Sequence, residues 1–286
     1  MTAPHLFCFG FGYVARALAS APAIDGWTIS GTTRDSEPAA AAYPMHRFDR
    51  AHKLAPGVFA DATHILVSVP PDDAGDPVLD SHGGDIGALP RLNWLGYLST
   101  TGVYGDRGGA SVDEGAELRP SGARGRRRVA AEAGWLALWR RRGVPVHIFR
   151  LAGIYGPGRS PFDALRAGTA RRIDVPGHLF SRIHVEDIAA VLAASIARPR
   201  PGAIYNVCDD EPAQPSDVVA YAAQLLGMAP PPLVPFDGAE LSPMARSFWT
   251  DNRRVSNAQL KQELGIRLSY PDYRAGLRAI LAAERG

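Results

Sequence analysis

The sequence predicts an α/β protein with a doubly wound parallel sheet, and two observations support this class. Short β-like runs alternate with alanine-rich helical stretches through the first two thirds of the chain. A glycine turn, Gly10-x-Gly12-x-x-Ala15, joins the first predicted strand to the first predicted helix. The predicted strands are His5–Phe9, Trp27–Gly31, His64–Val69, Trp94–Ser99, Val146–Arg150 and Ile204–Val207.

Helices are predicted where alanines recur at a spacing that lets a helix pack closely on a sheet. Proline-rich Ala229–Pro235 is predicted to be a polyproline-type connector within a small C-terminal lobe. The predicted helices span Tyr13–Ala21, Arg126–Arg142, Val185–Ala197, Pro215–Leu226 and Tyr273–Glu284.

Composition indicates a globular protein of enzyme size. The chain has 286 residues, of which 46% are hydrophobic and 21% charged, and its net charge of only +2 does not favour bulk nucleic-acid binding. The two cysteines, Cys8 and Cys208, have apolar or β-branched neighbours, so we expect buried thiols in a reduced cytosolic protein, with neither a disulfide nor a metal site. The N-terminus lacks signal-peptide features and no apolar run reaches the ~18 residues of a membrane span, which favours a cytoplasmic protein that does not enter membranes.

The glycine turn suits a dinucleotide. Gly10 permits the tight turn, Gly12 lets a pyrophosphate approach the backbone, and Ala15 keeps the helix close to the strand. The free N–H groups of the first helical turn, including those of Tyr13 and Val14, would face the anion. We therefore expect a bound dinucleotide at this turn.

The end of the second strand favours NADP over NAD. An acidic residue there would bind the ribose hydroxyls, but the chain offers Thr33 and Arg34, which suit a 2′-phosphate. In the alternative, Arg34 is an ordinary surface arginine and Asp35 binds the ribose, as in NAD proteins. Asp49 is predicted to touch the adenine amino group, and an ordinary loop aspartate is an equally good interpretation.

Four motifs in order resemble one family. They are LSTTGVYGD (Leu98–Asp106), FRLAGIYGPGR (Phe149–Arg159), SRIHVEDIAAVL (Ser181–Leu192) and AIYNVCDDEP (Ala203–Pro212). Together they resemble the extended short-chain dehydrogenases/reductases, the NAD-dependent epimerase/dehydratase group. The resemblance implies a Rossmann domain over residues 1–165, with a further strand near 203–208, and a smaller, interleaved C-terminal α/β substrate lobe over 166–286.

The same resemblance implies a catalytic region that is altered in this chain. In the family, a Ser or Thr three residues before the valine of V-Y-G binds the substrate oxygen, and Thr100 has that position. A tyrosine acts as acid and base, and a lysine four residues later binds the nicotinamide ribose. When the family's glutamate is set on Glu132, the lysine position falls on Arg128 and the tyrosine position on Arg124.

Arginine cannot replace the tyrosine in proton transfer, because its pKa lies above ~12 and it stays protonated. Arg128 could still bind the ribose, but the usual relay is broken. No shift of register restores it: the residues four before Lys53 and Lys261 are aspartate and asparagine, so the chain has no Y-x-x-x-K. This branch of the family is therefore atypical.

Another group would have to move the proton. Tyr104 and Tyr155 are equal candidates for this role, and His184 and His82 are weaker ones, with His82 placed in a mobile loop. The predicted catalytic residues are Thr100, Arg124, Arg128 and Tyr104. The predicted cofactor-binding residues are Gly10, Gly12, Tyr13, Val14, Thr33, Arg34, Asp49, Ser68, Val69, Pro70, Ser99 and Arg128.

Other departures concern the substrate and metals. The family's nucleotide-sugar asparagine falls at Gly153 and its phosphate-binding arginine at Phe180, so a sugar nucleotide is poorly supported. Asp187 is interpreted as a helix cap. The acids after the third strand are interpreted as part of a solvated turn, and no metal is predicted. Those acids are Asp72, Asp73, Asp76 and Asp80.

Residues 124–128 contain four arginines. Arg126 and Arg127 suit a solvated face balanced by Glu132 and an anion-binding role equally well. Arg124 and Arg128 lie one helical turn apart, so they would suit an acidic or phosphorylated small molecule. Two functions remain open: an NADP-dependent oxidoreductase or epimerase with an altered proton donor, and a non-catalytic NADP sensor. The resemblance suggests a homodimer, and no nucleic-acid partner is predicted.

Overall fold

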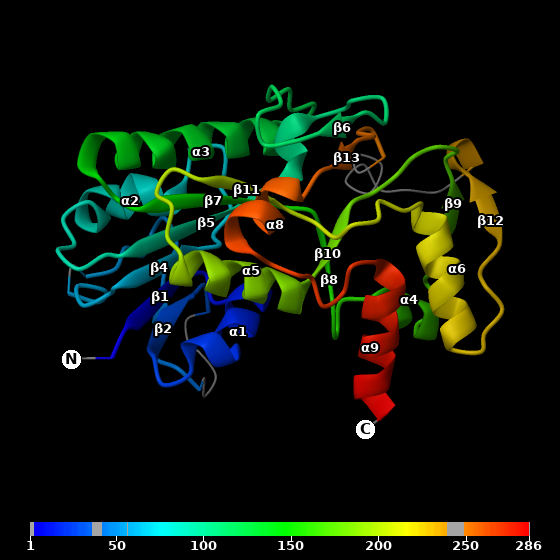
Figure 1. The fold of residues 1–286 in the computed structure, drawn as a ribbon, viewed down its shortest axis with the longest axis horizontal. Coiled ribbons are helices and arrows are strands. Elements are labelled where there is room, and N and C mark those ends of the chain that lie inside the picture. Colours follow the sequence, from blue (N-terminus) through cyan, green and yellow to red (C-terminus); the bar gives the residue numbers. More distant parts are fainter. Residues whose placement is uncertain (1–2, 36–41, 56, 239–248, 286) are drawn as a thin grey trace.

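A computed structural model describes residues 3–35, 42–55, 57–238 and 249–285 (Figure 1). Its central feature is a seven-stranded sheet in the order β11-β7-β5-β4-β1-β2-β3, in which every neighbouring pair is parallel. The order reverses direction between β1 and β4, which defines a doubly wound Rossmann sheet and confirms the predicted fold class. The strands are β1 (His5–Phe9), β2 (Thr28–Thr33), β3 (Met45–Arg47), β4 (His64–Val67), β5 (Trp94–Thr100), β7 (Val146–Leu151) and β11 (Ile204–Val207).

Helices cover both faces of this sheet (Figure 1). On one face lie α2 (Pro77–Ile86) and α3 (Ala123–Arg142). On the other face lie α1 (Tyr13–Ala19), α5 (Val185–Ala197) and α8 (Ala258–Leu264).

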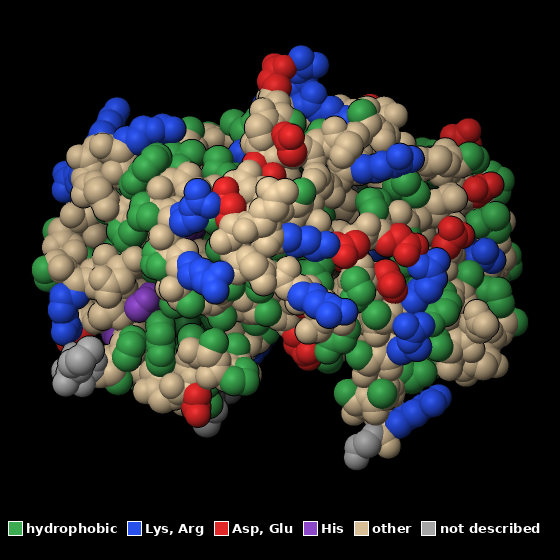
Figure 2. Space-filling model, viewed as in Figure 1, with side chains coloured by type: hydrophobic (Ala, Val, Ile, Leu, Met, Phe, Trp, Pro, Cys, Tyr) green, Lys and Arg blue, Asp and Glu red, His purple; other side chains and the backbone are tan. Residues whose placement is uncertain are grey.

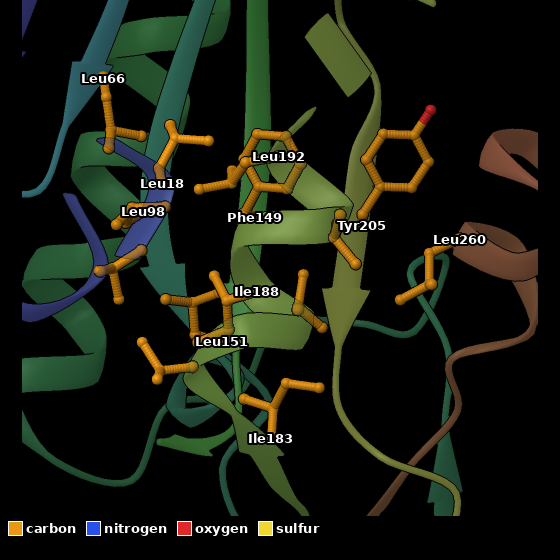
Figure 3. Packing of buried hydrophobic residues seen from close by; sticks show 14 of the residues in the cluster. Leu18, Leu66, Leu98, Phe149, Leu151, Ile183, Ile188, Leu192, Tyr205 and Leu260 are labelled. Atoms are coloured by element: carbon orange, nitrogen blue, oxygen red, sulfur yellow. The ribbon is translucent and has the colours of Figure 1, made fainter. Parts of the chain in front are cut away.

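The larger core lies under α1, α5 and α8. Figure 3 shows Leu18 of α1 and Leu192 of α5 gathered around Phe149 of the central strand β7, with Leu260 of α8 at the side of the cluster. These side chains are fully buried, and each such burial contributes about 2 kcal/mol of transfer free energy. This packing fixes the sheet whose strand ends carry the candidate site.

The remaining elements form a smaller lobe, on the right of Figure 1. Its core packs Phe162, Val218 and Leu277 from three helices. The helices of this lobe are α4 (Pro161–Arg166), α6 (Pro215–Leu225) and α9 (Tyr273–Arg285). Strands β9 (Arg172–Asp174) and β12 (Leu233–Pro235) form a two-stranded parallel sheet in this lobe. Two other two-stranded parallel sheets contribute side chains to the larger core: β8 (Gly153–Tyr155) with β10 (Arg182–His184), and β6 (Ser111–Val112) with β13 (Arg254–Val255). Short 3-10 turns span Pro22–Ile24, Thr101–Tyr104 and Phe236–Gly238.

The predicted domain boundary at residue 165 does not separate the two lobes along the chain. Segments beyond it return to the large sheet, because α5 and α8 pack on one face and β11 forms an edge strand. β11 lies within the segment near 203–208 at which a further strand is predicted, and the helices α5 and α8 also lie against the large sheet. The connector Ala229–Pro235 also contains β12, which pairs with β9.

The loop predicted after the third strand contains helix α2, which corrects the solvated-turn interpretation for Asp76 and Asp80. Asp72 and the exposed Asp73 do lie in a turn before this helix. Asp76 caps α2 by accepting hydrogen bonds from the N–H groups of Val78 and Leu79, both at 3.0 Å, and from Trp135 Nε1 at 3.1 Å. His82 lies inside α2 and is 2% exposed, so it is not a mobile loop residue. The prolines and glycines of this segment are typical of a loop, so the sequence did not predict the helix. Its N-cap and its buried face stabilise it.

Both cysteines are free and buried, Cys8 within β1 and Cys208 directly after β11. Within the described part of the chain, no helix combines the length and the apolar character needed to cross a membrane.

Candidate functional site

The glycine turn lies at the carboxyl end of β1, at the point where the strand order reverses. Gly10 has φ +86°, and its N–H donates to Thr32 Oγ1 at 2.8 Å. Ser68, which follows β4, donates from Oγ to the Gly10 carbonyl at 2.6 Å. A Cβ on residue 10 would stand 2.6 Å from that Oγ, so both backbone conformation and space require glycine.

Gly12 differs from Gly10 because it borders open space. A Cβ placed there would have no heavy atom within 4 Å, and no side chain caps the start of α1. The Tyr13 hydroxyl donates to the Pro157 carbonyl at 2.9 Å, and the Val14 side chain is buried in the core. Tyr13 and Val14 therefore offer a ligand their backbone N–H groups rather than side-chain atoms.

At the end of β2, Thr33 and Asp35 are joined by hydrogen bonds. The Thr33 hydroxyl donates to Asp35 Oδ2 at 3.1 Å and accepts from the Asp35 N–H at 3.2 Å. Arg34 stands between them and is exposed. The arrangement leaves the Arg34 guanidinium accessible beside the strand end, as a ligand phosphate would require.

The Asp49 carboxylate accepts hydrogen bonds from residues of its own loop. Its Oδ1 accepts hydrogen bonds from the N–H groups of Ala51 and His52 and from His52 Nδ1, all within 2.9 Å. The His52 hydrogen bond lowers the pKa of the Asp49 carboxyl. Contact between Asp49 and adenine stays a prediction. After Ser68, Val69 is half-buried and Pro70 is exposed, so both lie on the loop that leads from β4 to α2.

Thr100 and Arg124 lie near the carboxyl end of β5. Thr100 Oγ1 accepts a hydrogen bond from the Gly102 N–H at 3.1 Å and so caps the turn Thr101–Tyr104, while its hydroxyl hydrogen stays available. Arg124 is exposed in the first turn of α3. The parallel sheet thus brings the carboxyl ends of β1, β2, β4 and β5 to one edge, where the predicted cofactor and catalytic positions gather.

Arg128, at the family's lysine position, is bound to β5. Its Nη1 donates to the Tyr97 hydroxyl at 2.9 Å and to the Leu98 carbonyl at 2.7 Å. Its guanidinium carbon also lies 5.5 Å from the centroid of the Tyr97 ring. Burial raises the pKa of the Tyr97 phenol, so this hydroxyl stays protonated. Arg128 therefore fastens α3 to the strand that carries Thr100.

A buried polar network lies beside this contact. Ser99 donates to Glu132, whose carboxylate pairs with Arg150 at 2.8 Å, with both side chains at most 3% exposed. Arg150 Nη1 donates to the Tyr104 hydroxyl at 2.8 Å, and that hydroxyl donates to Asn206 Oδ1 at 2.7 Å. Glu132 thus balances an internal arginine, not the surface arginines of α3.

This network corrects the prediction of Tyr104 as a catalytic residue. The Tyr104 side chain is fully buried, and its hydroxyl donates to Asn206 Oδ1 and accepts from Arg150 Nη1. Burial also raises the pKa of the phenol. A group so enclosed cannot exchange a proton with a ligand at the strand ends. Ser99 is likewise buried, and its hydroxyl is directed to Glu132, so contact between Ser99 and a cofactor stays a prediction.

Arg126 and Arg127, the other arginines of the cluster at residues 124–128, have separate partners. Arg127 pairs with Asp73, and Arg126 Nη1 donates to the Ser121 carbonyl at 3.3 Å. Figure 2 shows positive and negative side chains interspersed on the face in view, with no extended patch of one sign. These contacts favour the solvated-face interpretation for Arg126 and Arg127.

The other acid-base candidates have structural roles. His184 caps α5 by accepting from the Glu186 N–H at 3.3 Å, and burial lowers its pKa. The Tyr155 hydroxyl donates to the Asp272 carbonyl at 3.4 Å. Asp187 accepts from the N–H groups of Ser269 and Tyr270, so it anchors the segment before α9 instead of capping its own helix. Across the described ranges, no group of three or more His, Cys, Asp or Glu residues could hold a metal ion.

Three known proteins resemble the whole chain, although no protein-family model matches it. A functionally unknown conserved protein from Silicibacter pomeroyi DSS is 52% identical, with a TM-score of 0.91 over 98% of this chain and 99% of that chain. A putative NAD-dependent epimerase/dehydratase from Methylobacillus flagellatus is 26% identical, with a TM-score of 0.74 over 99% of both chains. Protein YeeZ of Escherichia coli is 29% identical over 281 residues, which cover 92% of this chain and 95% of YeeZ.

This chain has the NAD-dependent epimerase/dehydratase fold. At 52% identity it also belongs to one family with the Silicibacter pomeroyi protein. The same epimerase/dehydratase fold occurs at 17% identity in a dTDP-glucose 4,6-dehydratase of Bacillus anthracis, solved in complex with NAD, with a TM-score of 0.75 over 99% of this chain and 97% of that chain.

Sequence reasoning missed several residues that shape the site. Thr32 orients Gly10, Tyr97 holds Arg128, and Arg150 neutralises Glu132. The spacing of these residues carries no signal, because their partners lie between 18 and 31 residues away along the chain. Only the sheet register brings them together.

Proposed function

We propose that this chain binds a nicotinamide dinucleotide at the carboxyl ends of β1, β2 and β4, with NADP preferred to NAD. The observation that carries the proposal is the pair of glycines at the switch point. Gly10 is held in a left-handed conformation by Thr32 and Ser68, and Gly12 opens onto free space. A pyrophosphate fits such a turn, since it needs close backbone approach and free N–H groups.

The preference for NADP rests on Arg34. Its guanidinium is exposed, whereas the neighbouring Asp35 carboxylate is already bound by Thr33. A 2′-phosphate beside Arg34 gains charge-assisted hydrogen bonds that a ribose hydroxyl does not offer.

The proposed activity is that of an oxidoreductase or epimerase on an anionic small molecule. When bound, the nicotinamide would accept or return a hydride. Thr100, at the end of β5, would donate a hydrogen bond to a substrate oxygen, and the exposed Arg124 would attract an acidic group of the substrate. Neither arginine at positions 124 and 128 moves a proton at neutral pH.

A non-catalytic NADP sensor is the second candidate, and the placement of Arg128 favours it. Arg128, aligned with the family's lysine, donates hydrogen bonds from Nη1 to Tyr97 and Leu98. It therefore supports the strand instead of a proton relay. In this function, cofactor binding would be reported through a partner, and we propose a second copy of this chain as the first partner to test. Light scattering with and without NADP measures that assembly.

Calorimetric titration with NADP(H) and NAD(H) tests the cofactor proposal. We expect NADP to bind more tightly than NAD by about tenfold, a difference of about 1.4 kcal/mol. Arg34→Ala should abolish this preference, and Arg140→Ala, which removes an exposed arginine from the far end of α3, should leave it unchanged. The proposal fails if neither cofactor binds at ~1 mM, near the weak end of the affinity scale.

Turnover separates the enzyme from the sensor. Two assays on a panel of acidic carbonyl compounds measure turnover: hydride transfer followed at the nicotinamide absorbance, and NADP-dependent isomerisation of the compound itself. Either activity would support the enzyme if Thr100→Val slows it. Tight NADP binding with no turnover on the panel and an NADP-dependent change in assembly would support the sensor.

A further inference from the structure

A second cavity lies in the smaller lobe, outside the cofactor site. It has a volume of about 370 Å³, within the usual range of small-molecule pockets. Strands β8 and β10 form its floor, and the start of α6 borders it. Its lining residues are Gly153, Ile154, Tyr155, Phe180, Ser181, Arg182, Pro215 and Trp249.

Arg182 is the single basic side chain among these lining residues. Its Nη1 donates to the carbonyls of Phe180 and Ala213, at 2.9 and 3.0 Å. Its Nε and Nη2 make no hydrogen bond with any described residue. These two nitrogens form one edge of the guanidinium, the edge that binds a carboxylate through two parallel hydrogen bonds.

The buried carboxyl group of Asp209 lies near Arg182 without pairing directly with it. Asp209 is 1% exposed, and neither of its carboxylate oxygens has a hydrogen-bond partner of normal geometry among the described residues. Burial raises the pKa of Asp209 to about 8, against the attraction of Arg182. Burial also lowers the pKa of Arg182. The guanidinium is therefore held in place and poorly solvated, which favours an anion at its open edge.

Aromatic side chains also line the cavity, and the guanidinium carbon of Arg182 lies 6.0 Å from the centroid of the Phe180 ring. The rings of Phe180 and Trp249 meet edge to face, with centroids 5.5 Å apart and planes at 79°. The Tyr155 ring adds a third aromatic surface, while its hydroxyl points to the Asp272 carbonyl. A flat ring can stack on one of these walls and meet another at its edge.

From these observations we infer that the cavity binds a planar unsaturated or aromatic ring that carries one carboxylate. The ring lies against Phe180 and Trp249, and the carboxylate receives two hydrogen bonds from the open edge of Arg182. The inference rests on the proposed function, because it names the class of substrate that this lobe presents to the cofactor site.

The charge of the cavity selects a monoanion. A diphosphate would bring two or more negative charges to a cavity whose lining offers the single positive charge of Arg182. The unpaired Asp209 nearby supplies no further positive charge. Phe180 adds an apolar surface, and Gly153 offers no side-chain hydrogen bond. A ring with a single carboxylate matches both the one cation and the apolar walls.

Calorimetry with trans-cinnamate and its neutral isostere cinnamamide tests the inference, since the two share one shape and differ in charge. We expect cinnamate to bind with a Kd below ~1 mM and cinnamamide at least about tenfold more weakly. Arg182→Gln should weaken cinnamate by about tenfold or more, and Trp249→Leu by about fivefold, whereas Arg140→Gln should have no effect.

Arg182 is buried, so each variant is first checked by thermal melting. If Arg182→Gln does not fold, Gly153→Val provides an independent test. A Cβ at Gly153 would be in ordinary contact with Ser181 and Arg182, so valine should fit the strand and fill the cavity. Loss of cinnamate binding in Gly153→Val would then support the inference.

Equal binding of cinnamate and cinnamamide would overturn the inference, as would unchanged affinity in a folded Arg182→Gln protein. Arg182-dependent binding of UDP without cinnamate binding would replace the monoanion with a nucleotide. NADP titration distinguishes the two proposals: NADP binding without cinnamate binding contradicts only this inference, and cinnamate binding without NADP binding contradicts only the proposed cofactor.

Discussion

Arg128 and Tyr97 are joined by a hydrogen bond of 2.9 Å, and the same Nη1 reaches the Leu98 carbonyl at 2.7 Å. The first turns of α3 are thereby fixed to β5 just before Thr100. Arg128, which the sequence resemblance aligns with the family's lysine, thus joins a helix to a strand in this structure.

Replacing Arg128 with methionine should lower the free energy of unfolding by about 2 kcal/mol, because the Tyr97 hydroxyl and the Leu98 carbonyl lose a charged donor. Urea unfolding measures the change. Arg126→Met, on the exposed face of the same helix, should leave stability unchanged within error. Equal stability of the two variants would contradict a fastening role for Arg128.

The two glycines of the first turn should respond differently to alanine. Gly10→Ala forces an alanine to φ +86° with its Cβ 2.6 Å from Ser68 Oγ, so stability should fall by about 2 kcal/mol.

Gly12→Ala meets no neighbouring atom and should fold normally. Its methyl group would nevertheless occupy the space proposed for the pyrophosphate and weaken NADP binding by about tenfold or more. Thermal melting and calorimetry separate the two effects; normal NADP affinity in Gly12→Ala would argue against this turn as the cofactor site.

Glu132 should be essential for stability, because Arg150 would otherwise be a buried, uncompensated charge. We expect Glu132→Gln to lower the free energy of unfolding by about 3 kcal/mol, measured by urea denaturation. Glu117→Gln interrupts the exposed pair with Arg119 and provides the matched control, with no measurable change. A small effect at Glu132 would mean that water reaches the network.

Asp209 should make stability fall as pH rises. Its pKa is raised from 3.8 to about 8 in the folded protein, so between these values the folded state binds a proton that the unfolded state has lost. The free energy of unfolding therefore decreases from pH ~4 to ~8, by at most about 6 kcal/mol from this group, and no further above pH 8. The groups facing Asp209 are Arg182, Asp210 and the backbone N–H of Glu211.

Asp209→Asn isolates this contribution from other titrating groups. The difference in stability between variant and wild type should grow in favour of the variant as pH rises from ~4 to ~8, because asparagine resembles the neutral acid. A difference that does not depend on pH would show that Asp209 is ionised throughout this range.

Periodicity and turn chemistry predicted much of the fold. The bounds of β1, β11 and α5 agree with the sequence prediction, because each combines a clear apolar pattern with a distinct end. Helix α2 was missed because two glycines and flanking prolines resemble a loop, while the interactions that stabilise it are tertiary. Among these are the contacts of the His82 ring with Phe9, Phe48 and Phe59.

The candidate site was only partly predictable for the same reason. The glycine positions follow from local backbone demands, which are visible in a short segment. Tyr104 was misjudged because its partners, Arg150 and Asn206, lie 46 and 102 residues away. Asn206 belongs to β11, so the enclosure of Tyr104 depends on a strand that arrives late in the chain.

That late strand has a consequence for synthesis on the ribosome. When residue 165 has been made, six strands of the large sheet exist, but β11, α5 and α8 do not. The β7 edge then has no neighbour, and the apolar surface around Phe149 is uncovered. A nascent chain of this length is therefore open to aggregation and to chaperone binding until about a hundred further residues have emerged, which makes completion of the first domain a late event in translation.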